Sequence, residues 1–148
     1  MWGYTLRVPD VWHERPLDVE GGHGVLFAPD PVDAQTALVI EVRDLGTEVT
    51  SADLPDLERA FLRGLRAVVG SHLEQHATFT NEFALGCEAV QTYVESGQRR
   101  KRWINLLYRD TRQARLIAQG ATVEEFDRLR PLFAPCVTTF MFTERSTV

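Results

Sequence analysis

Apolar and polar residues alternate with a period of two through residues 86–120. Successive side chains of an extended chain point to opposite faces, so this period indicates strands. Three strands are predicted from it, over residues 87–96, 103–109 and 114–119. The connections at residues 96–102 and 110–112 are turns, with Gly97 and Asp110 as the turn residues. Both are too short for a parallel crossover, so the strands are expected to be antiparallel neighbours.

The middle strand of the three is mostly apolar on both faces. One face carries Ile104, Leu106 and Tyr108, and the other carries Trp103, Asn105 and Leu107. A strand of this kind is typical of a sheet that has helices or loops on each side. The pattern therefore predicts covering elements on both faces of the sheet.

Shorter alternating segments predict four more strands, over residues 4–8, 25–28, 37–44 and 77–83. After the third of these, apolar residues recur at steps of three and four, which is the period of an amphipathic helix. This stripe consists of Leu54, Leu57, Phe61, Leu65 and Val68. Asp53 is expected to cap the helix at its N-terminus, and Gly70 is expected to end it.

A second helix is predicted to begin after Thr122. Thr122 and Glu125 have the spacing of a capping box, in which each side chain bonds to the backbone N–H of the other residue. Pro131 is expected to break or kink this helix near Arg130, because proline lacks a backbone N–H and crowds the preceding turn. The remaining segment, residues 137–142, is expected to form at most a short terminal strand.

Together these elements predict an α+β fold with a single antiparallel sheet of about six to seven strands, covered by helices on both faces. Residues 1–148 are expected to form one domain, because this length is in the usual single-domain range. With 44% hydrophobic and 25% charged residues, the composition is typical of a globular protein without membrane spans. Trp12 lies in a segment predicted to be irregular, residues 11–16, and is expected to close one end of the core.

Charge and cysteine content narrow the classes of function. The formal net charge of −5 argues against general binding of nucleic acids. Cys87 and Cys136 are too few for a disulfide scaffold, although a single bridge between them stays open. A strand-like segment opens at Tyr4, which leaves no room for a signal peptide before it. The protein is therefore predicted to be cytoplasmic.

A run of four cations interrupts this acidic chain just before a tryptophan. Such a run fits contact with an acidic partner, a phosphate backbone or an anionic membrane surface. The other interpretation is a solvated hairpin that keeps one end of the sheet soluble. Aromatic side chains carry much of the energy of protein interfaces, which adds two tryptophans to the candidates. The candidate binding residues are Arg99, Arg100, Lys101, Arg102, Trp103 and Trp12.

The sequence carries no recognisable catalytic or metal-binding motif. His72 and His76 are four residues apart, but their segment HLEQH departs from HExxH, and Gly70 is expected to end the helix before them. The glycine-rich residues 21–24 precede a strand, so they are expected to form a hairpin turn and not a phosphate loop. No GxSxG elbow or CxxC pair is present. We therefore predict no cofactor, no metal and no catalytic residue.

Several segments resemble the PsbP-like and Ran-binding Mog families. They are the opening YTLRVPDVW, then GVLFAP and ALVIEV, the GCEA at residues 86–89 and the stretch from Phe133 to Phe142. The resemblance implies an antiparallel sheet covered by helices. It also implies binding or assembly, as in photosystem subunits, a small-GTPase partner, envelope lipoproteins and bacterial secretion-effector chaperones. The chain departs from the lipoprotein branch in showing no signal or lipidation cysteine.

These expectations favour a non-catalytic protein-binding or assembly module, whose partner is an unidentified protein or a second copy in a homodimer. The alternative is a small-ligand-binding protein or an enzyme, with a pocket between sheet and helix. Its polar groups would be Tyr93, Asn105 and Tyr108. A deep apolar pocket with converging polar groups would favour the alternative, whereas a flat apolar patch would favour a protein partner.

Overall fold

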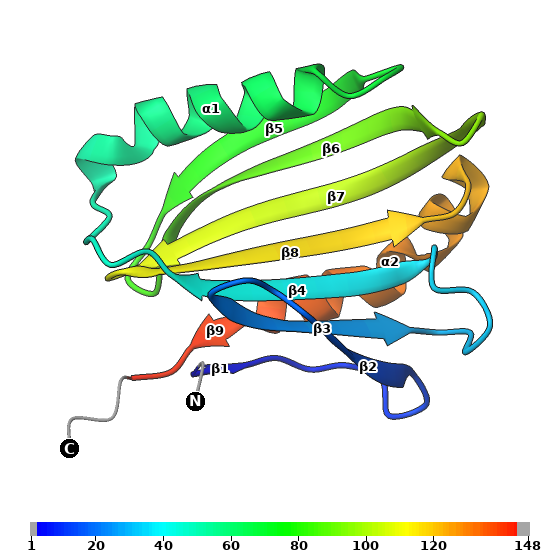
Figure 1. Ribbon diagram of the computed structural model, residues 1–148, viewed down its shortest axis with the longest axis horizontal. Helices are drawn as coiled ribbons and strands as arrows, with labels where there is room; N and C mark the ends of the chain where they lie inside the picture. The colour runs from blue at the N-terminus through cyan, green and yellow to red at the C-terminus, as the bar shows by residue number, and fades with distance from the viewer. Residues whose placement is uncertain (1–2, 145–148) are drawn as a thin grey trace.

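The structure is a computed structural model and describes residues 3–144. Seven strands form one sheet in the order β2-β3-β4-β8-β7-β6-β5, and every neighbouring pair is antiparallel (Figure 1). The strands are β2 His13–Leu17, β3 Gly22–Ala28, β4 Ala37–Asp44, β5 His72–Thr80, β6 Leu85–Glu95, β7 Gln98–Arg109 and β8 Arg112–Gly120. The predicted α+β class and antiparallel sheet of about six to seven strands are confirmed.

The three strands predicted over residues 87–96, 103–109 and 114–119 are adjacent in this sheet, as β6, β7 and β8. Two-residue turns join these strands, and Ser96 and Asp110 adopt left-handed φ values of 52° and 57° that short polar residues tolerate. The first turn closes so early that β7 already starts at Gln98, and Arg99 faces Val94 across the hairpin. The prediction that residues 96–102 form a linker is therefore wrong. A closed turn fixes the register, so pairing continues through the cations.

Two helices pack on the sheet, α1 Leu54–Arg66 and α2 Val123–Thr139, and the short 3-10 turn η1 Ser51–Asp53 precedes α1. On β8, Leu116 and Ala118 pack in one cluster with Phe133 of α2, whereas Ile117 packs in another with Leu65 of α1. Adjacent strand residues point to opposite faces, so the two helices lie on opposite sides. However, α1 contacts β5 and β6, whereas α2 contacts β7 and β8. Each helix therefore covers only part of its face.

The second helix starts as predicted but does not break at its prolines. The Oγ1 of Thr122 accepts a hydrogen bond from the N–H of Glu125 (3.1 Å), and α2 then continues through Pro131 and Pro135 to Thr139. The predicted break near Arg130 is wrong. Prolines cost a helix about 3 kcal/mol each, but tertiary burial provides most helix stability in proteins and here outweighs that cost. The buried residues of α2 are Phe126, Leu129, Phe133, Cys136 and Val137.

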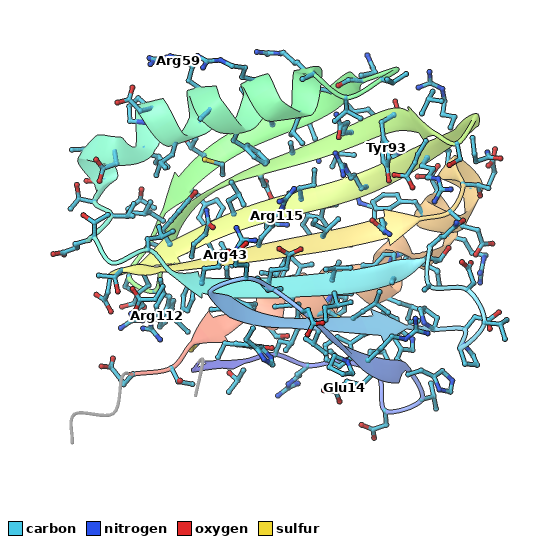
Figure 2. The ribbon with its side chains drawn as sticks, in the orientation of Figure 1. Glu14, Arg43, Arg59, Tyr93, Arg112 and Arg115 are labelled. Atoms are coloured by element: carbon cyan, nitrogen blue, oxygen red, sulfur yellow. The ribbon has the colours of Figure 1, made fainter. Side chains whose placement is uncertain are left out.

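A second, two-stranded sheet joins the two ends of the described chain, where β1 Tyr4–Thr5 pairs with β9 Met141–Phe142. Arg112 of β8 holds this sheet in place (Figure 2). Its Nη1 donates to the backbone oxygen of Thr143 (2.8 Å), and its guanidinium lies 5.0 Å from the ring centre of Phe142. The strand predicted over residues 4–8 is thus shorter and lies outside the main sheet.

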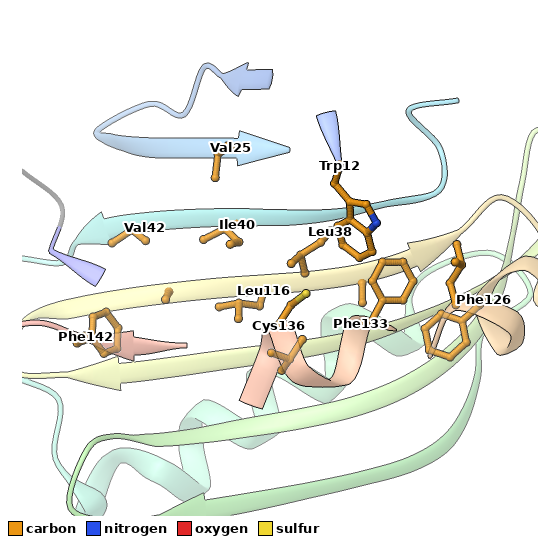
Figure 3. Packing of buried hydrophobic residues seen from close by; sticks show 14 residues of the cluster. Trp12, Val25, Leu38, Ile40, Val42, Leu116, Phe126, Phe133, Cys136 and Phe142 are labelled. Atoms are coloured by element: carbon orange, nitrogen blue, oxygen red, sulfur yellow. The ribbon is translucent and has the colours of Figure 1, made fainter. Parts of the chain in front are cut away.

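The largest hydrophobic cluster lies between α2 and the middle of the sheet (Figure 3). Trp12 packs edge-on against Phe133 with 5.7 Å between ring centres, and Phe133 lies 6.2 Å from Phe126. The predicted role of Trp12 in closing the core is confirmed, since it is only 9% exposed. The prediction of an irregular segment around it is partly wrong, because β2 begins at His13.

Candidate functional site

An apolar groove opens where α2 leaves its face of the sheet uncovered. It lies between strands β5 to β7 on one side and the end of α2 with β9 on the other, and its volume is about 370 Å³. The lining residues are Phe79, Asn81, Phe83, Ala84, Glu88, Trp103, Asn105, Leu107, Val137, Thr138, Phe140, Met141 and Phe142. Residues far apart in the second half of the sequence, from Phe79 to Phe142, thus form one concave surface.

The floor of the apolar groove contains a buried donor that lacks a partner. Asn105 is 4% exposed, and its Nδ2 makes no hydrogen bond with any residue between 3 and 144. Glu88 lies directly opposite on β6 but accepts a hydrogen bond from Trp103 Nε1 (3.4 Å). A buried unsatisfied donor costs about 1 to 3 kcal/mol, so the fold keeps Asn105 at an energetic loss.

Local features of the sequence shape the rim of the groove. Gly86 of β6 leaves room for the Phe79 ring to lie over that strand, because a Cβ at Gly86 would be only 2.7 Å from the ring. In the turn between β5 and β6, Asn81 Oδ1 accepts hydrogen bonds from the N–H groups of Phe83 (2.8 Å) and Ala84 (3.0 Å). Phe83 is thereby held at the rim with 45% of its surface exposed, and Met141 from β9 is 43% exposed. The rim therefore presents large apolar side chains to the solvent.

The predicted basic run does not form one continuous patch, because its side chains alternate between the two faces of β7. Lys101 is 8% exposed and pairs with Asp127 (2.9 Å) and Glu74 (3.1 Å). Arg100 is 5% exposed, and its Nη1 lies 3.7 Å from Glu95. Arg99 is exposed and makes only long hydrogen bonds. Two of the four cations are thus used inside the fold.

The last members of the predicted set lie in different places. Arg102 donates through Nε to Gln91 Oε1 (2.9 Å) and stacks 4.4 Å over the Tyr93 ring, on the α1 side. Trp103 faces the other side and lines the apolar groove, and Trp12 is buried in the core. Of the predicted binding residues, only Trp103 reaches the groove. A binding role for the remaining residues stays a prediction.

The polar groups proposed for a ligand pocket do not meet. Asn105 points into the α2 side of β7, whereas Tyr108, three residues further along, points to the α1 side. The Tyr108 hydroxyl accepts a hydrogen bond from Gln113 Nε2 (2.9 Å). The guanidinium of Arg102 covers one face of the Tyr93 ring. Asn105 is therefore the one member of that group in the groove. The sequence signal for it was a single amide among the apolar residues of a central strand.

Neither of the two cysteines lines the apolar groove. Cys87 and Cys136 are free and buried. Burial, with a smaller contribution from the charge of Glu58, raises the pKa of Cys87 to about 11, and burial also raises the pKa of Cys136. Both are therefore protonated thiols at neutral pH. Within residues 3–144, no group of three His, Cys, Asp or Glu side chains is arranged to hold a metal ion.

The fold is PsbP-like. The structure matches cyanobacterial PsbP (CyanoP) from Synechocystis sp. PCC 6803 with a TM-score of 0.70 and 14% identity, covering 95% of this chain and 87% of that one. It also matches LpqN of Mycobacterium tuberculosis, described as involved in cell envelope biogenesis (TM-score 0.68, 14% identity, 95% and 83% covered). A third match is PA94 of Pseudomonas aeruginosa, a protein of unknown function and putative regulator (TM-score 0.58, 13% identity, 91% and 99% covered).

Sequence comparison adds no family. No protein-family model matches the chain, and a search of curated proteins returned no match. The expected resemblance to PsbP-like proteins is confirmed at the level of the fold, whereas the expected resemblance to Mog stays a prediction. In the part of the chain that the structure describes, neither helix is long and apolar enough to cross a membrane.

Proposed function

We propose that the chain is a single PsbP-like domain that acts as a non-catalytic binding module, and that its apolar groove receives an apolar segment of a protein partner. The observation that carries this proposal is Asn105, whose buried Nδ2 has no partner within residues 3–144 and which lies in the lining of the groove. A carbonyl oxygen on the bound segment would accept a hydrogen bond from this amide.

A peptide fits the groove because it combines apolar side chains with carbonyl groups at every residue. The groove runs beside β5, which is an edge strand with mostly exposed residues. Exposed edges and apolar grooves are both used to bind extended segments of other proteins. Phe83 and Met141 at the rim would contact the segment first, and Trp103 would contact it in the groove. Large apolar side chains of this kind provide much of the energy in protein interfaces.

The proposal is tested by capture of the partner from a lysate of the native cells with tagged protein. Phe83→Asp and Met141→Asp place a carboxylate in the groove, and both positions are exposed enough to tolerate it. Val32→Asp is the matched control, because Val32 is 90% exposed and does not line the groove. We expect the control to retain a protein that both groove variants lose, with unchanged melting temperatures. Retention of every captured protein by both groove variants would contradict the proposal.

A second candidate is a small apolar ligand in the same groove. A volume of about 370 Å³ is within the range of small-molecule pockets, which starts at about 300 Å³, and this observation favours the candidate. Binding of the neutral dye Nile red to the free protein, lost in Phe83→Asp and accompanied by no captured protein, would favour the small ligand over the peptide.

Location and oligomeric state stay predictions. A cytoplasmic protein would appear in the soluble fraction of gently lysed cells. The likeness to LpqN, a protein described as involved in cell envelope biogenesis, makes an envelope location the alternative that fractionation would reveal. Light scattering during gel filtration distinguishes the monomer from the homodimer.

A further inference from the structure

A second hollow, here called the arginine pocket, lies on the opposite side of the sheet from the apolar groove. It opens where α1 leaves β4, β8 and part of β7 uncovered, and its volume is about 360 Å³. The polar lining consists of Glu41, Arg43, Arg102, Gln113 and Arg115, and the apolar lining of Ala60, Phe61, Gly64, Leu65, Val68 and Leu106. Figure 2 shows Arg43 and Arg115 over β4, β8 and β7, the strands that α1 leaves uncovered.

The charges of the arginine pocket are not balanced. Glu41 lies directly opposite Arg115 across the strands but pairs with Arg43 (3.6 Å). Arg102 and Arg115 have no carboxylate within 4.0 Å among the residues that the structure describes. Three cations and one anion therefore line the pocket of a protein whose net charge is −5. Like charges gathered in a hollow create a local field that attracts anions.

Arg102 is held in position before any ligand arrives. The buried Gln91 accepts a hydrogen bond from Arg102 Nε and donates through Nε2 to the carbonyl oxygen of Leu65 (2.6 Å) and to Ser71 Oγ (2.8 Å). The Tyr93 ring supports the guanidinium from one face. Burial lowers the pKa of Arg102, and the charge of Arg115 contributes to the same shift. The two terminal nitrogens of Arg102 make no hydrogen bond within residues 3–144, so they stay available for a ligand.

The wall opposite the cations is apolar and contains a glycine. Phe61 and Leu65 of α1, together with Val68 just after the helix, form this wall. A Cβ at Gly64 would meet no atom within 4 Å, so this position faces open space and a larger side chain there would occupy part of the pocket. The pocket thus offers an anion site at one side and an apolar surface at the other.

We propose that the arginine pocket binds a small organic anion, a carboxylate or a phosphate monoester, with its charged group on Arg102 and Arg115 and its apolar group against Phe61 and Gly64. The planar guanidinium suits both head groups, because it donates two parallel hydrogen bonds to either one. This site is separate from the apolar groove and does not depend on the function proposed for it.

The test is isothermal titration with octanoate and octyl phosphate, which differ in head group, and with octylamine, which reverses the charge. We expect one or both anions to bind and octylamine not to bind. Arg115→Gln is expected to weaken binding about tenfold or more, since a charged hydrogen bond is lost. Gly64→Leu should abolish binding by filling the pocket, while Arg59→Gln, an exposed cation of α1 outside the pocket, should leave it unchanged.

A variant of the apolar groove shows whether the anions bind in the arginine pocket or in the groove. Phe83→Asp alters the apolar groove and should not change the affinity for the anions. Gly64→Leu and Arg115→Gln change positions that are exposed, and circular dichroism verifies that both variants fold. The proposal is overturned if neither anion binds, if octylamine binds as well as octanoate, or if binding survives both Arg115→Gln and Gly64→Leu.

Discussion

The two helices contribute unequally to the stability of the sheet. Five residues of α2 are buried, and they belong to a cluster that extends from Trp12 to Phe142. Only Leu62 and Leu65 of α1 are buried, and the cluster beneath α1 contains four buried residues. The α2 side therefore forms the main core, whereas the α1 side has room for polar groups. Both hollows lie where a helix leaves its face of the sheet uncovered.

The largest expected effect tests this difference between the two sides. Phe133→Ala removes the ring at the centre of the α2 cluster and should lower the free energy of unfolding by about 3 to 5 kcal/mol. Leu65→Ala on the α1 side should cost about 2 kcal/mol, at the low end for leucine, because its cluster is small. Urea unfolding measures both. Equal losses would contradict the unequal contribution of the helices.

A smaller effect concerns the ion pairs that join β5 to α2. Lys101→Met should cost about 1 to 2 kcal/mol, because Glu74 and Asp127 lose a buried partner but are themselves partly exposed. Burial alone would lower the pKa of Lys101, but hydrogen bonds to Asp127 and Glu74 outweigh it and raise the pKa above 10.5.

The stabilisation by Lys101 should therefore be complete below pH 10.5 and be lost as the pH rises through the higher pKa of the folded protein. Denaturant unfolding of the wild type and of Lys101→Met at several pH values measures this difference. A difference that stays constant from neutral pH to well above that pKa would show that the charge of Lys101 does not stabilise the fold.

The third prediction is a substitution that increases the stability of the free protein. Asn105→Leu removes the unsatisfied donor at the floor of the groove and should stabilise the free protein by about 1 kcal/mol. The same change should weaken capture of the partner, because the acceptor on the bound segment loses its donor. Thermal unfolding and capture measure the two effects. A destabilised variant that still binds would mean that Asn105 serves the fold and not the site.

The smallest expected effect is on the α1 side. Gly64→Ala should stabilise the protein by about 0.5 to 1 kcal/mol, because alanine favours a helix and the added Cβ meets open space. Gly86→Ala is the contrast and should destabilise the protein, because its Cβ would overlap the Leu106 carbonyl oxygen. Thermal melting compares the two variants. Loss of stability in Gly64→Ala would mean that α1 packs more tightly than described.

The sheet could be predicted from the sequence because the residues that specify each strand and turn are close together in the chain. The alternating residues of β6, β7 and β8 and the turns at Gly97 and Asp110 specify antiparallel neighbours without knowledge of the rest of the chain. Strand β7 was predicted too short because charged residues such as Lys101 hide the period of two. Lys101 is accommodated in the strand by partners that are far away in the sequence, Glu74 on β5 and Asp127 on α2.

The sites could not be predicted because they depend on long-range packing. The apolar groove brings Phe79, Asn105 and Met141 together from β5, β7 and β9. No local pattern indicates that α2 continues through Pro131, yet that continuation determines where β9 begins and so where the groove ends. The arginine pocket likewise brings together Arg102, which was predicted to lie in a linker and is in β7, and Arg115 of β8.

The most direct test of the proposed function is a ¹⁵N correlation spectrum of the protein with and without its captured partner. The side-chain signals of Asn105 Nδ2 and Trp103 Nε1 should shift when the partner binds, because both residues line the apolar groove. The Nε1 signal of Trp12, which lies in the core, should stay in place. Unchanged Asn105 and Trp103 signals in a saturated complex would show that the partner binds elsewhere and would contradict the account.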